Sequence, residues 1–281
     1  MLNPSVTPPQ DLYISVNGID TRYWQMGCGS TIILLHGGNG SIEFWLYNIA
    51  TLAQHHQVYA FDMVGSGKSD FPDGSYSLGE QAKFLHGFMA ALNIDTATLI
   101  GNSMGGGVAL EFTRSYPDRV DKLVLVDSMG LGKDISLGIR LITLPAIVNL
   151  LRPGRWMIPA MLKSNFYNSK QLPPEWIEFR YPIFALPGRN RVILRLGQSN
   201  FNLAGVRAQV YQPILDSLAK ITQKTLIIWG DCDRIIPVKH AYVAAAGIPN
   251  SQLHIFPNCG HHPYLEYPEK FDRLVLEFLT A

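Results

Sequence analysis

The feature that most restricts the fold of this chain is a short apolar run that ends in Gly101-Asn102-Ser103-Met104-Gly105. Thr98-Leu99-Ile100 predicts a buried strand, and the small residues that lead into Val108-Ala109-Leu110 predict a helix. The pentapeptide fits the G-x-S-x-G pattern, in which a strand turns sharply into a helix and exposes a serine hydroxyl. Ser103 is therefore predicted to be a nucleophile. The alternative is a glycine-rich turn with an incidental serine.

Strand and helix patterns alternate on both sides of this turn. Asn17-Gly18 predicts a hairpin between residues 11–16 and 19–26, and Ser77 with Glu80 fits a capping box at the start of a helix that runs to Leu92. Further strands are expected over Thr31–Leu35, Val58–Phe61, Leu123–Val126, Thr225–Trp229 and Gln252–Phe256, and further helices over Phe44–Leu52, Val238–Ala246 and Pro268–Leu279. We expect an α/β fold with a mostly parallel central sheet covered by helices on both faces.

The alternation stops between residues 130 and 215. Prolines recur there, the apolar spacing is helical but interrupted, and strand signals are missing. We interpret residues 130–215 as a helical cap, inserted between a first part of the core at 1–129 and a second part at 216–281. The alternative is that these helices belong to the core itself.

Charge and cysteine content exclude several classes of protein. The net charge is +1 and no basic stripe is present, so we expect no nucleic-acid partner. Cys28, Cys232 and Cys259 are too scattered for a zinc site or a disulfide framework, and we expect no metal and no cofactor. The stretch around Gly67-Lys68 is not a nucleotide-binding P-loop, because Asp62 stands where that motif needs its first glycine.

The chain shows no sign of a membrane span or of a secretory signal. Its longest apolar run, Leu141–Leu151, is interrupted by Pro145 and is too short to cross a bilayer. The N-terminus lacks the basic and apolar regions of a signal peptide. We expect a cytoplasmic protein that acts on a small-molecule substrate, and a homo-oligomer is left open.

A serine nucleophile needs a base, and the base needs a carboxylate that orients it. In α/β sheets with this turn, the expected chain order is serine, acid, histidine. Asp233 and His261 follow the last two predicted strands in that order, so they are the predicted acid and base. Asp231, which could instead cap its turn, is the second candidate acid. Asp127, which could instead bond loop backbone, is the third.

The oxyanion of the reaction needs two backbone N–H donors. One is predicted at Met104, directly after the nucleophile, and the other in the loop His36-Gly37-Gly38-Asn39. We predict Gly38 as the second donor, with Asn39 in reserve.

Several of these segments together resemble the α/β-hydrolase superfamily. The resemblance covers roughly residues 20–130 and 216–281. It rests on His36-Gly37-Gly38, Asp62-Met63-Val64-Gly65-Ser66-Gly67-Lys68-Ser69, the elbow Gly101-Asn102-Ser103-Met104-Gly105-Gly106, Trp229-Gly230-Asp231-Cys232-Asp233 and Gly260-His261. The resemblance implies an α/β-hydrolase fold with an inserted cap, and it assigns the acid to Asp233.

Within that superfamily, the elbow looks like that of the meta-cleavage product hydrolases, which split a C–C bond in vinylogous 1,5-diketones. This similarity implies that Asn102 lies at the substrate and that the cap residue Arg180 binds a substrate carboxylate; a solvated position for Arg180 is the alternative. His262 stands where that family usually has tryptophan, and we predict that it lines the pocket. Asn39 is also predicted to contact substrate.

These observations predict a serine hydrolase that cleaves a carboxylic ester or the C–C bond of a vinylogous diketone. One alternative is a small-molecule receptor built on a hydrolase scaffold. Another is a cofactor-free haloperoxidase-like or acyltransferase-like enzyme, which would use the same serine.

Overall fold

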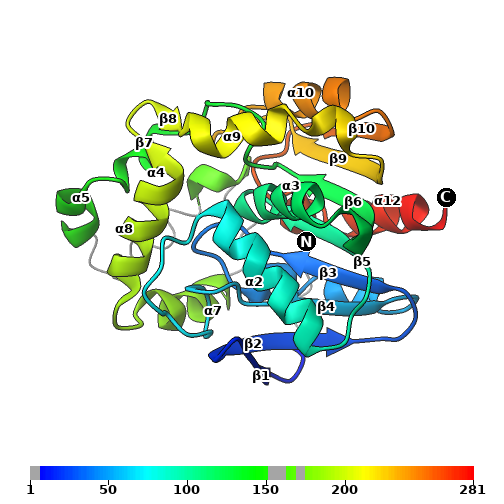
Figure 1. Cartoon of the computed structure of the whole chain (residues 1–281), viewed down its shortest axis with the longest axis horizontal. Helices are drawn as coiled ribbons and strands as arrows, with labels where there is room; N and C mark the ends of the chain where they lie inside the picture. The colour runs from blue at the N-terminus through cyan, green and yellow to red at the C-terminus, as the bar shows by residue number, and fades with distance from the viewer. Residues whose placement is uncertain (1–6, 151–162, 169–174) are drawn as a thin grey trace.

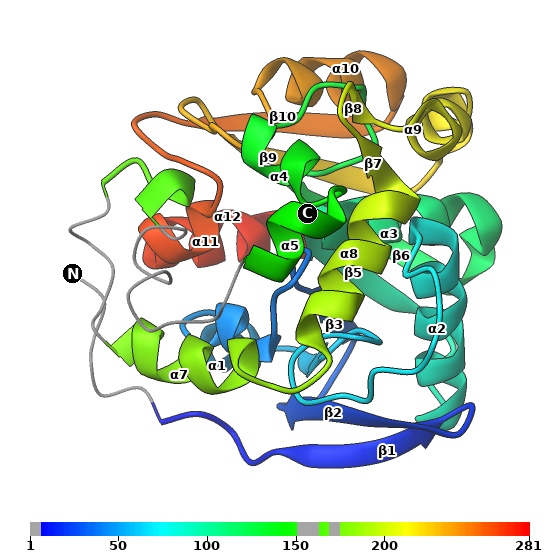
Figure 2. The ribbon, with the colours of Figure 1, turned by 90° about the vertical axis from the view of Figure 1, so that its left-hand side faces the viewer.

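The protein is described here from a computed structural model, which describes residues 7–150, 163–168 and 175–281. An eight-stranded sheet in the order β1-β2-β4-β3-β5-β6-β9-β10 crosses the molecule, with helices on both faces (Figures 1 and 2). From β4 to β10 neighbouring strands are parallel, whereas β1 with β2 and β2 with β4 are antiparallel. The strands are β1 Leu12–Val16, β2 Ile19–Met26, β3 Thr31–Leu35, β4 Gln57–Phe61, β5 Ala97–Asn102, β6 Val120–Val126, β9 Lys224–Gly230 and β10 Ser251–Phe256.

The predicted hairpin joins β1 to β2. Val16 pairs with Ile19 across the turn, and Asn17 and Gly18 have φ angles of 53° and 81°. A two-residue turn of this kind needs positive φ at both central positions, which asparagine and glycine tolerate.

Two hydrophobic cores lie on opposite faces of the sheet. On one face, α2, α3 and α10 contribute side chains such as Phe88, Phe112 and Ala244; on the other, α1 and α12 contribute Leu52 and Phe271. The helices of these layers are α1 Ile49–Leu52, α2 Leu78–Ala91, α3 Met104–Ser115, α10 Lys239–Gly247, α11 Pro263–Glu266 and α12 Pro268–Thr280, with short 3-10 helices at Ile42–Trp45, Pro117–Arg119 and Leu218–Lys220.

The predicted capping box at the start of α2 forms in part. The Ser77 hydroxyl accepts the amide of Glu80 as predicted. The Glu80 carboxylate reaches back to the amides of Ser75 and Tyr76 instead of the amide of Ser77. It thereby ties down the chain before the helix.

The expected continuous helix over Phe44–Leu52 is wrong. The structure has a 3-10 helix at Ile42–Trp45 and a separate helix α1 at Ile49–Leu52. Between them, the buried amide group of Asn48 donates to the Tyr264 carbonyl at 3.1 Å and to Asp272 at 2.8 Å. This long-range contact overrides the local helical spacing.

Residues 127–223 connect β6 to β9, and we call them the β6–β9 segment. The two-stranded sheet within it was not expected, because two-residue strands leave no alternation to recognise. The boundaries of the predicted cap, 130–215, stay a prediction. The elements described are α4 Leu137–Leu141, α5 Pro145–Leu150, α7 Glu175–Phe184, α8 Arg189–Asn200, β7 Phe201–Asn202, β8 Gly205–Val206 and α9 Ala208–Leu215.

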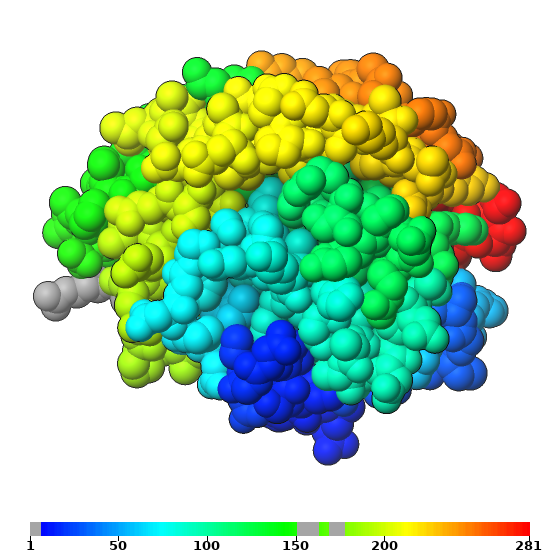
Figure 3. Space-filling model, viewed as in Figure 1, coloured from blue at the N-terminus to red at the C-terminus, as the bar shows by residue number. Residues whose placement is uncertain are grey.

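In Figure 1 the described helices α4, α5, α7 and α8 of the β6–β9 segment lie on the left of the sheet, whereas α9 lies at the top, near α10. In the space-filling view its yellow-green and yellow surface forms a band over the left and upper part of the molecule (Figure 3). In the part of the chain that the structure describes, no helix combines the length and the apolarity that crossing a bilayer demands.

Candidate active site

The predicted nucleophile, Ser103, lies at a sharp turn between β5 and α3. Its φ of 55° and ψ of −118° form a strained conformation for a residue with a side chain. The turn is tight, since a β-carbon at Gly105 would overlap the carbonyl oxygens of Leu35 and His36. The Ser103 amide donates to the Val126 carbonyl over 2.9 Å and ties the turn to β6. The serine is half-buried at the carboxyl edge of the sheet.

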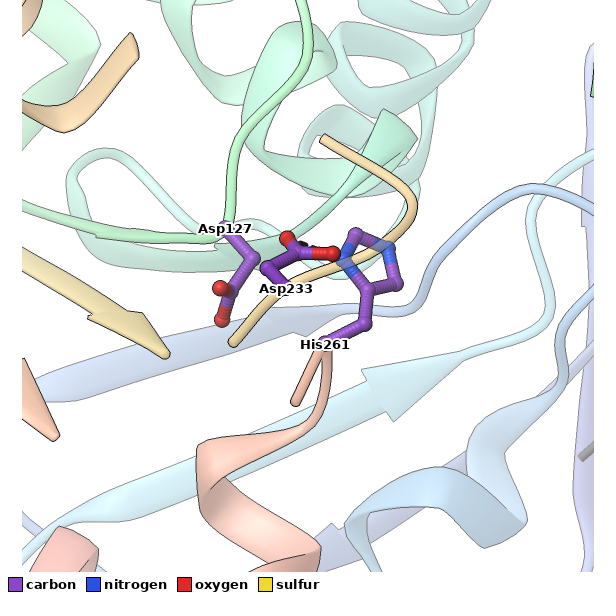
Figure 4. A group of neighbouring side chains, drawn as sticks. All are labelled: Asp127, Asp233 and His261. Carbon is purple, nitrogen blue, oxygen red and sulfur yellow. Dashed lines mark hydrogen bonds and ion pairs between the residues drawn. The ribbon is translucent and has the colours of Figure 1, made fainter. Parts of the chain in front are cut away.

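The predicted acid and base, Asp233 and His261, form a buried pair (Figure 4). Nδ1 of His261 lies 2.7 Å from Oδ2 of Asp233, and the two side chains are 4% and 0% exposed. The other oxygen of Asp233 accepts the amides of Ile235 and Ile236 at 2.7 and 3.1 Å. Three donors therefore hold this carboxylate, and its contact with Nδ1 leaves Nε2 of His261 for other chemistry.

The two other candidate acids do not contact the His261 ring through a hydrogen bond among the described residues. Asp231 is exposed and accepts the Cys259 amide at 3.2 Å. Asp127 is fully buried and accepts the Gly230 amide at 3.0 Å. Asp127 therefore bonds backbone, which is the alternative role that the sequence left open for it, and Asp231 bonds the backbone of the loop after β10.

The predicted oxyanion loop follows β3 and is held by the buried ring of His36. Its Nδ1 donates to the Gly37 carbonyl at 2.7 Å, and its Nε2 accepts the Met63 amide at 3.1 Å. The bond at Nε2 needs a free lone pair, so the ring is neutral with its proton on Nδ1, and burial lowers the pKa of His36 to about 3. The sequence did not single out this structural histidine, although it stands directly before the two glycines of the loop.

A cavity of about 460 Å³ brings the predicted site residues together. Its lining is mostly apolar, which suits a ligand that is bound by shape and oriented by a few polar groups. The predicted residues on its wall are Gly38, Asn39, Asn102, Ser103, Met104, Arg180, His261 and His262. The apolar wall from the β6–β9 segment includes Ile139, Ile142, Phe184, Leu196 and Phe201. Met104 begins α3, and amides in the first turn of a helix have no carbonyl partner within it.

Arg180 on α7 brings a buried positive charge to this cavity. It is 4% exposed, so the alternative of a solvated position is wrong. Its guanidinium lies 4.7 Å from the ring of Phe44 and 4.9 Å from that of Phe184. Burial lowers the pKa of Arg180 to about 9, which leaves the group charged at pH 7.

The hydrogen bonds of Arg180 are incomplete among the described residues. Nη2 donates to the Asn39 carbonyl at 2.8 Å, and Nη1 lies 3.5 Å from the Ser41 hydroxyl. Nε meets no acceptor in the described parts of the chain. A buried cation with an unused donor is a favourable partner for an anionic ligand group.

Asn39 is held between two arginines of the β6–β9 segment. Its side-chain oxygen accepts Nε of Arg189 at 2.9 Å, and its carbonyl accepts Arg180. With φ of 54°, Asn39 has the left-handed backbone conformation that asparagine tolerates better than most residues. Its side-chain oxygen is thus already paired. The residue lines the cavity, and its contact with substrate stays a prediction.

Asn102 also lines the cavity, but its amide is engaged within the protein. Nδ2 donates to the carbonyls of Val126 and His261 at 3.2 and 3.1 Å, and Oδ1 accepts the Tyr264 hydroxyl at 3.2 Å. The residue before the nucleophile therefore holds the loop of His261 in place.

His262 lies at the cavity wall as a neutral ring. It packs against Phe44 and Phe166, each with centroids 5.4 Å away, and its Nδ1 lies 3.2 Å from the Tyr264 hydroxyl. Burial lowers the pKa of His262 well below its usual range.

Two hydrogen bonds that join residues 165–167 to the chain around His261 were missed from the sequence. The His261 amide donates to the Asn165 carbonyl at 2.7 Å, and the Tyr167 amide donates to the Glu266 carboxylate at 2.8 Å. A β-carbon at Gly260 would press against that same Asn165 carbonyl. The glycine before His261 was the only sequence signal of this close approach.

Known proteins match this chain along nearly its whole length. A family model described as alpha/beta hydrolase fold matches residues 30–268. The 2-hydroxy-6-oxo-6-phenylhexa-2,4-dienoate hydrolase of Burkholderia cepacia is 33% identical over 265 residues, which cover 90% of this chain and 89% of that protein. The 2-hydroxy-6-oxo-6-(2'-aminophenyl)hexa-2,4-dienoic acid hydrolase of Metapseudomonas resinovorans is 31% identical, over 95% of this chain and 90% of that protein.

Solved structures agree with these relatives. The meta-cleavage product hydrolase of Pseudomonas fluorescens IP01, a mutant complexed with acetates, matches with a TM-score of 0.82 and 28% identity. The match covers 96% of this chain and 97% of that one.

Proposed function

The chain belongs to the α/β-hydrolase fold family and is a hydrolase, as predicted, and we propose that it is a serine hydrolase with Ser103, His261 and Asp233 as its triad. The single observation that carries this proposal is that Ser103, on its strained turn, shares one cavity with His261, whose ring is hydrogen-bonded to Asp233 behind it. Nucleophilic catalysis requires a serine that opens to the same cavity as an oriented histidine.

In the proposed reaction the Ser103 hydroxyl attacks a substrate carbonyl. His261 takes the serine proton on Nε2 and returns it to the leaving group, while Asp233 stabilises the charged ring through Nδ1. The amides of Met104 and Gly38 bind the oxyanion that forms. Water, activated by His261, then releases the acid product and restores Ser103.

The proposed substrate carries a carboxylate at one end and an apolar group at the other. Arg180 supports the first part, because it is a buried cation at the cavity with an unused donor among the described residues. The mostly apolar wall supports the second. Both relatives named above are dienoate hydrolases, so we propose a 2-hydroxy-6-oxo-dienoate as the substrate class.

Cleavage of the C–C bond in such a substrate requires one further proton transfer. The dienol must become a ketone before C5–C6 cleavage leaves a stable fragment, and His261 is the group we propose for that transfer. For an ester this step is absent, and the remaining steps are unchanged. We propose that residues 130–215 are the cap that closes over the substrate.

The test is steady-state turnover on a paired panel, with a 2-hydroxy-6-oxo-dienoate against short and medium p-nitrophenyl esters. We expect the dienoate to give a kcat/KM higher by orders of magnitude. Turnover of the esters alone would make the protein an esterase-like hydrolase and remove the C–C proposal. Turnover of neither would overturn the serine-hydrolase proposal.

A further inference from the structure

A second carboxyl group, that of Asp127, lies beside the acid and base of the site (Figure 4). It follows β6, where φ is 46°, a strained value for a residue other than glycine. Oxygen atoms of Asp127 and Asp233 and a ring nitrogen of His261 all lie within 4.8 Å of one another. The side chains of Asp127 and Asp233 are within hydrogen-bonding reach.

The hydrogen bonds around Asp127 and Asp233 indicate which of the two carboxyl groups is protonated. Asp233 already accepts three N–H groups, from Ile235, Ile236 and His261. Asp127 accepts one, from the Gly230 amide, and its Oδ2 finds no donor in the described parts of the chain. Two ionised carboxylates cannot remain in contact away from water, so one of them holds a proton. The carboxyl with fewer donors is the one that keeps it.

We propose that Asp127 is a positioning residue of the triad, whose protonated carboxyl group donates a hydrogen bond to the Asp233 carboxylate and holds it as the acceptor for His261. The catalytic consequence rests on the proposed function. A donor to Asp233 stabilises its ionised form, which the charged His261 ring needs as its partner during the reaction.

The surroundings of Asp127 agree with a neutral group. Burial, followed by the Asp233 carboxylate, raises the pKa of Asp127 well above its usual range. Apart from His261, no basic group among the described residues faces Asp127. The titratable groups facing Asp127 are Asp233, His261, Cys259, Tyr264 and Glu266.

Two substitutions test the proposal. Asp127→Asn keeps an acceptor for Gly230 and a donor for Asp233, whereas Asp127→Gly removes both and tolerates the positive φ. We expect D127G to lower kcat about tenfold or more, as for the loss of one hydrogen bond to a charged group, with KM little changed. D127N should recover most of that loss.

The pH profile separates a positioning role from a purely structural one. In D127G, Asp233 loses a donor and attracts the His261 proton more strongly, so the acid limb of kcat/KM should move up by about half a pH unit. In D127N it should stay within about 0.3 pH units of the wild type. Thermal melting of both variants controls for folding.

Three results would overturn the proposal. An acid limb in D127N that moves down by about one pH unit or more would mean that a negative charge had been removed, so Asp127 is ionised in the native protein. An unmoved limb in D127G, with a loss of kcat that follows the loss of melting temperature, would leave only a structural role. Wild-type kcat in D127G would leave no role.

The same shifts can be measured without turnover. Titration of the His261 ring by NMR in the wild type, D127N and D127G should show the same order of midpoints. If the panel detects no activity but these midpoints move as expected, the proposed function fails and the role of Asp127 stands.

Discussion

Replacing Arg180 should discriminate between substrates by their charge. The guanidinium is buried between two aromatic rings, and the described residues offer it a carbonyl and a hydroxyl rather than a carboxylate. A substrate carboxylate would supply that partner. Hydrogen bonds between charged groups contribute about 1.5–3 kcal/mol each, and removing one partner of a buried ion pair costs about 3–5 kcal/mol. We therefore expect Arg180→Ala to lower kcat/KM for a carboxylate substrate about 10²- to 10³-fold.

The assay compares a 2-hydroxy-6-oxo-dienoate with its neutral methyl ester in the wild type, R180A and R180K. Lysine keeps the charge but not the planar pair of donors. For the dienoate, kcat/KM of R180K should therefore lie between those of the wild type and R180A, about tenfold below the wild type. For the methyl ester, R180A should change kcat/KM by less than about threefold. Equal losses on both substrates would refute the reasoning, because they would show that Arg180 shapes the cavity without reading charge.

Three further predictions concern the nucleophile, the elbow and stability. Ser103→Ala and His261→Ala should each lower kcat by about 10⁴-fold or more with unchanged melting curves, and a variant that keeps near wild-type kcat would contradict the triad. Gly105→Ala should lower the free energy of unfolding, measured in urea, by about 3 kcal/mol or more, because a β-carbon there overlaps two carbonyl oxygens. The control is Gly79→Ala in α2, where a β-carbon meets open space and should raise the free energy of unfolding by about 0.5–1 kcal/mol. Burial raises the pKa of Asp272 to about 7, so the folded state binds more protons than the unfolded state between about pH 4 and pH 7. The free energy of unfolding of the wild type should therefore fall as the pH rises through this range, and in Asp272→Asn the fall measured by urea unfolding should be smaller by about 2–4 kcal/mol. An identical fall in both proteins would refute this prediction.

Short-range sequence patterns were sufficient to predict the central sheet with its helices and the order of the site residues along the chain. Alternation of strands and helices predicted a parallel sheet, and the carboxyl ends of parallel strands meet at one edge. For that reason Ser103, Asp233 and His261 could be assigned to one site, although the last two stand far along the chain from the first. The G-x-S-x-G spacing also predicted the sharp turn between β5 and α3 correctly.

Contacts between distant residues could not be read in this way. The choice between Asp231 and Asp233 depends on which side chain reaches the His261 ring, and both follow the same strand. Asn102 bonds the His261 carbonyl across 159 positions in sequence, and Asn48 reaches Asp272 across 224. Spacing carries no information about such pairs, so the split of the 44–52 helix and the pairing of the Asn102 amide emerged only with the structure.

The central claim, that Ser103 is an activated nucleophile, is tested most directly by covalent labelling. The wild type, S103A and H261A are incubated with an organophosphonate that reacts with activated serines, and the intact mass and the labelled peptide are measured. We expect one adduct per wild-type chain, on the peptide that contains Ser103, no adduct in S103A, and much slower labelling in H261A. An unlabelled wild type, or a label of equal extent in S103A, would contradict the claim.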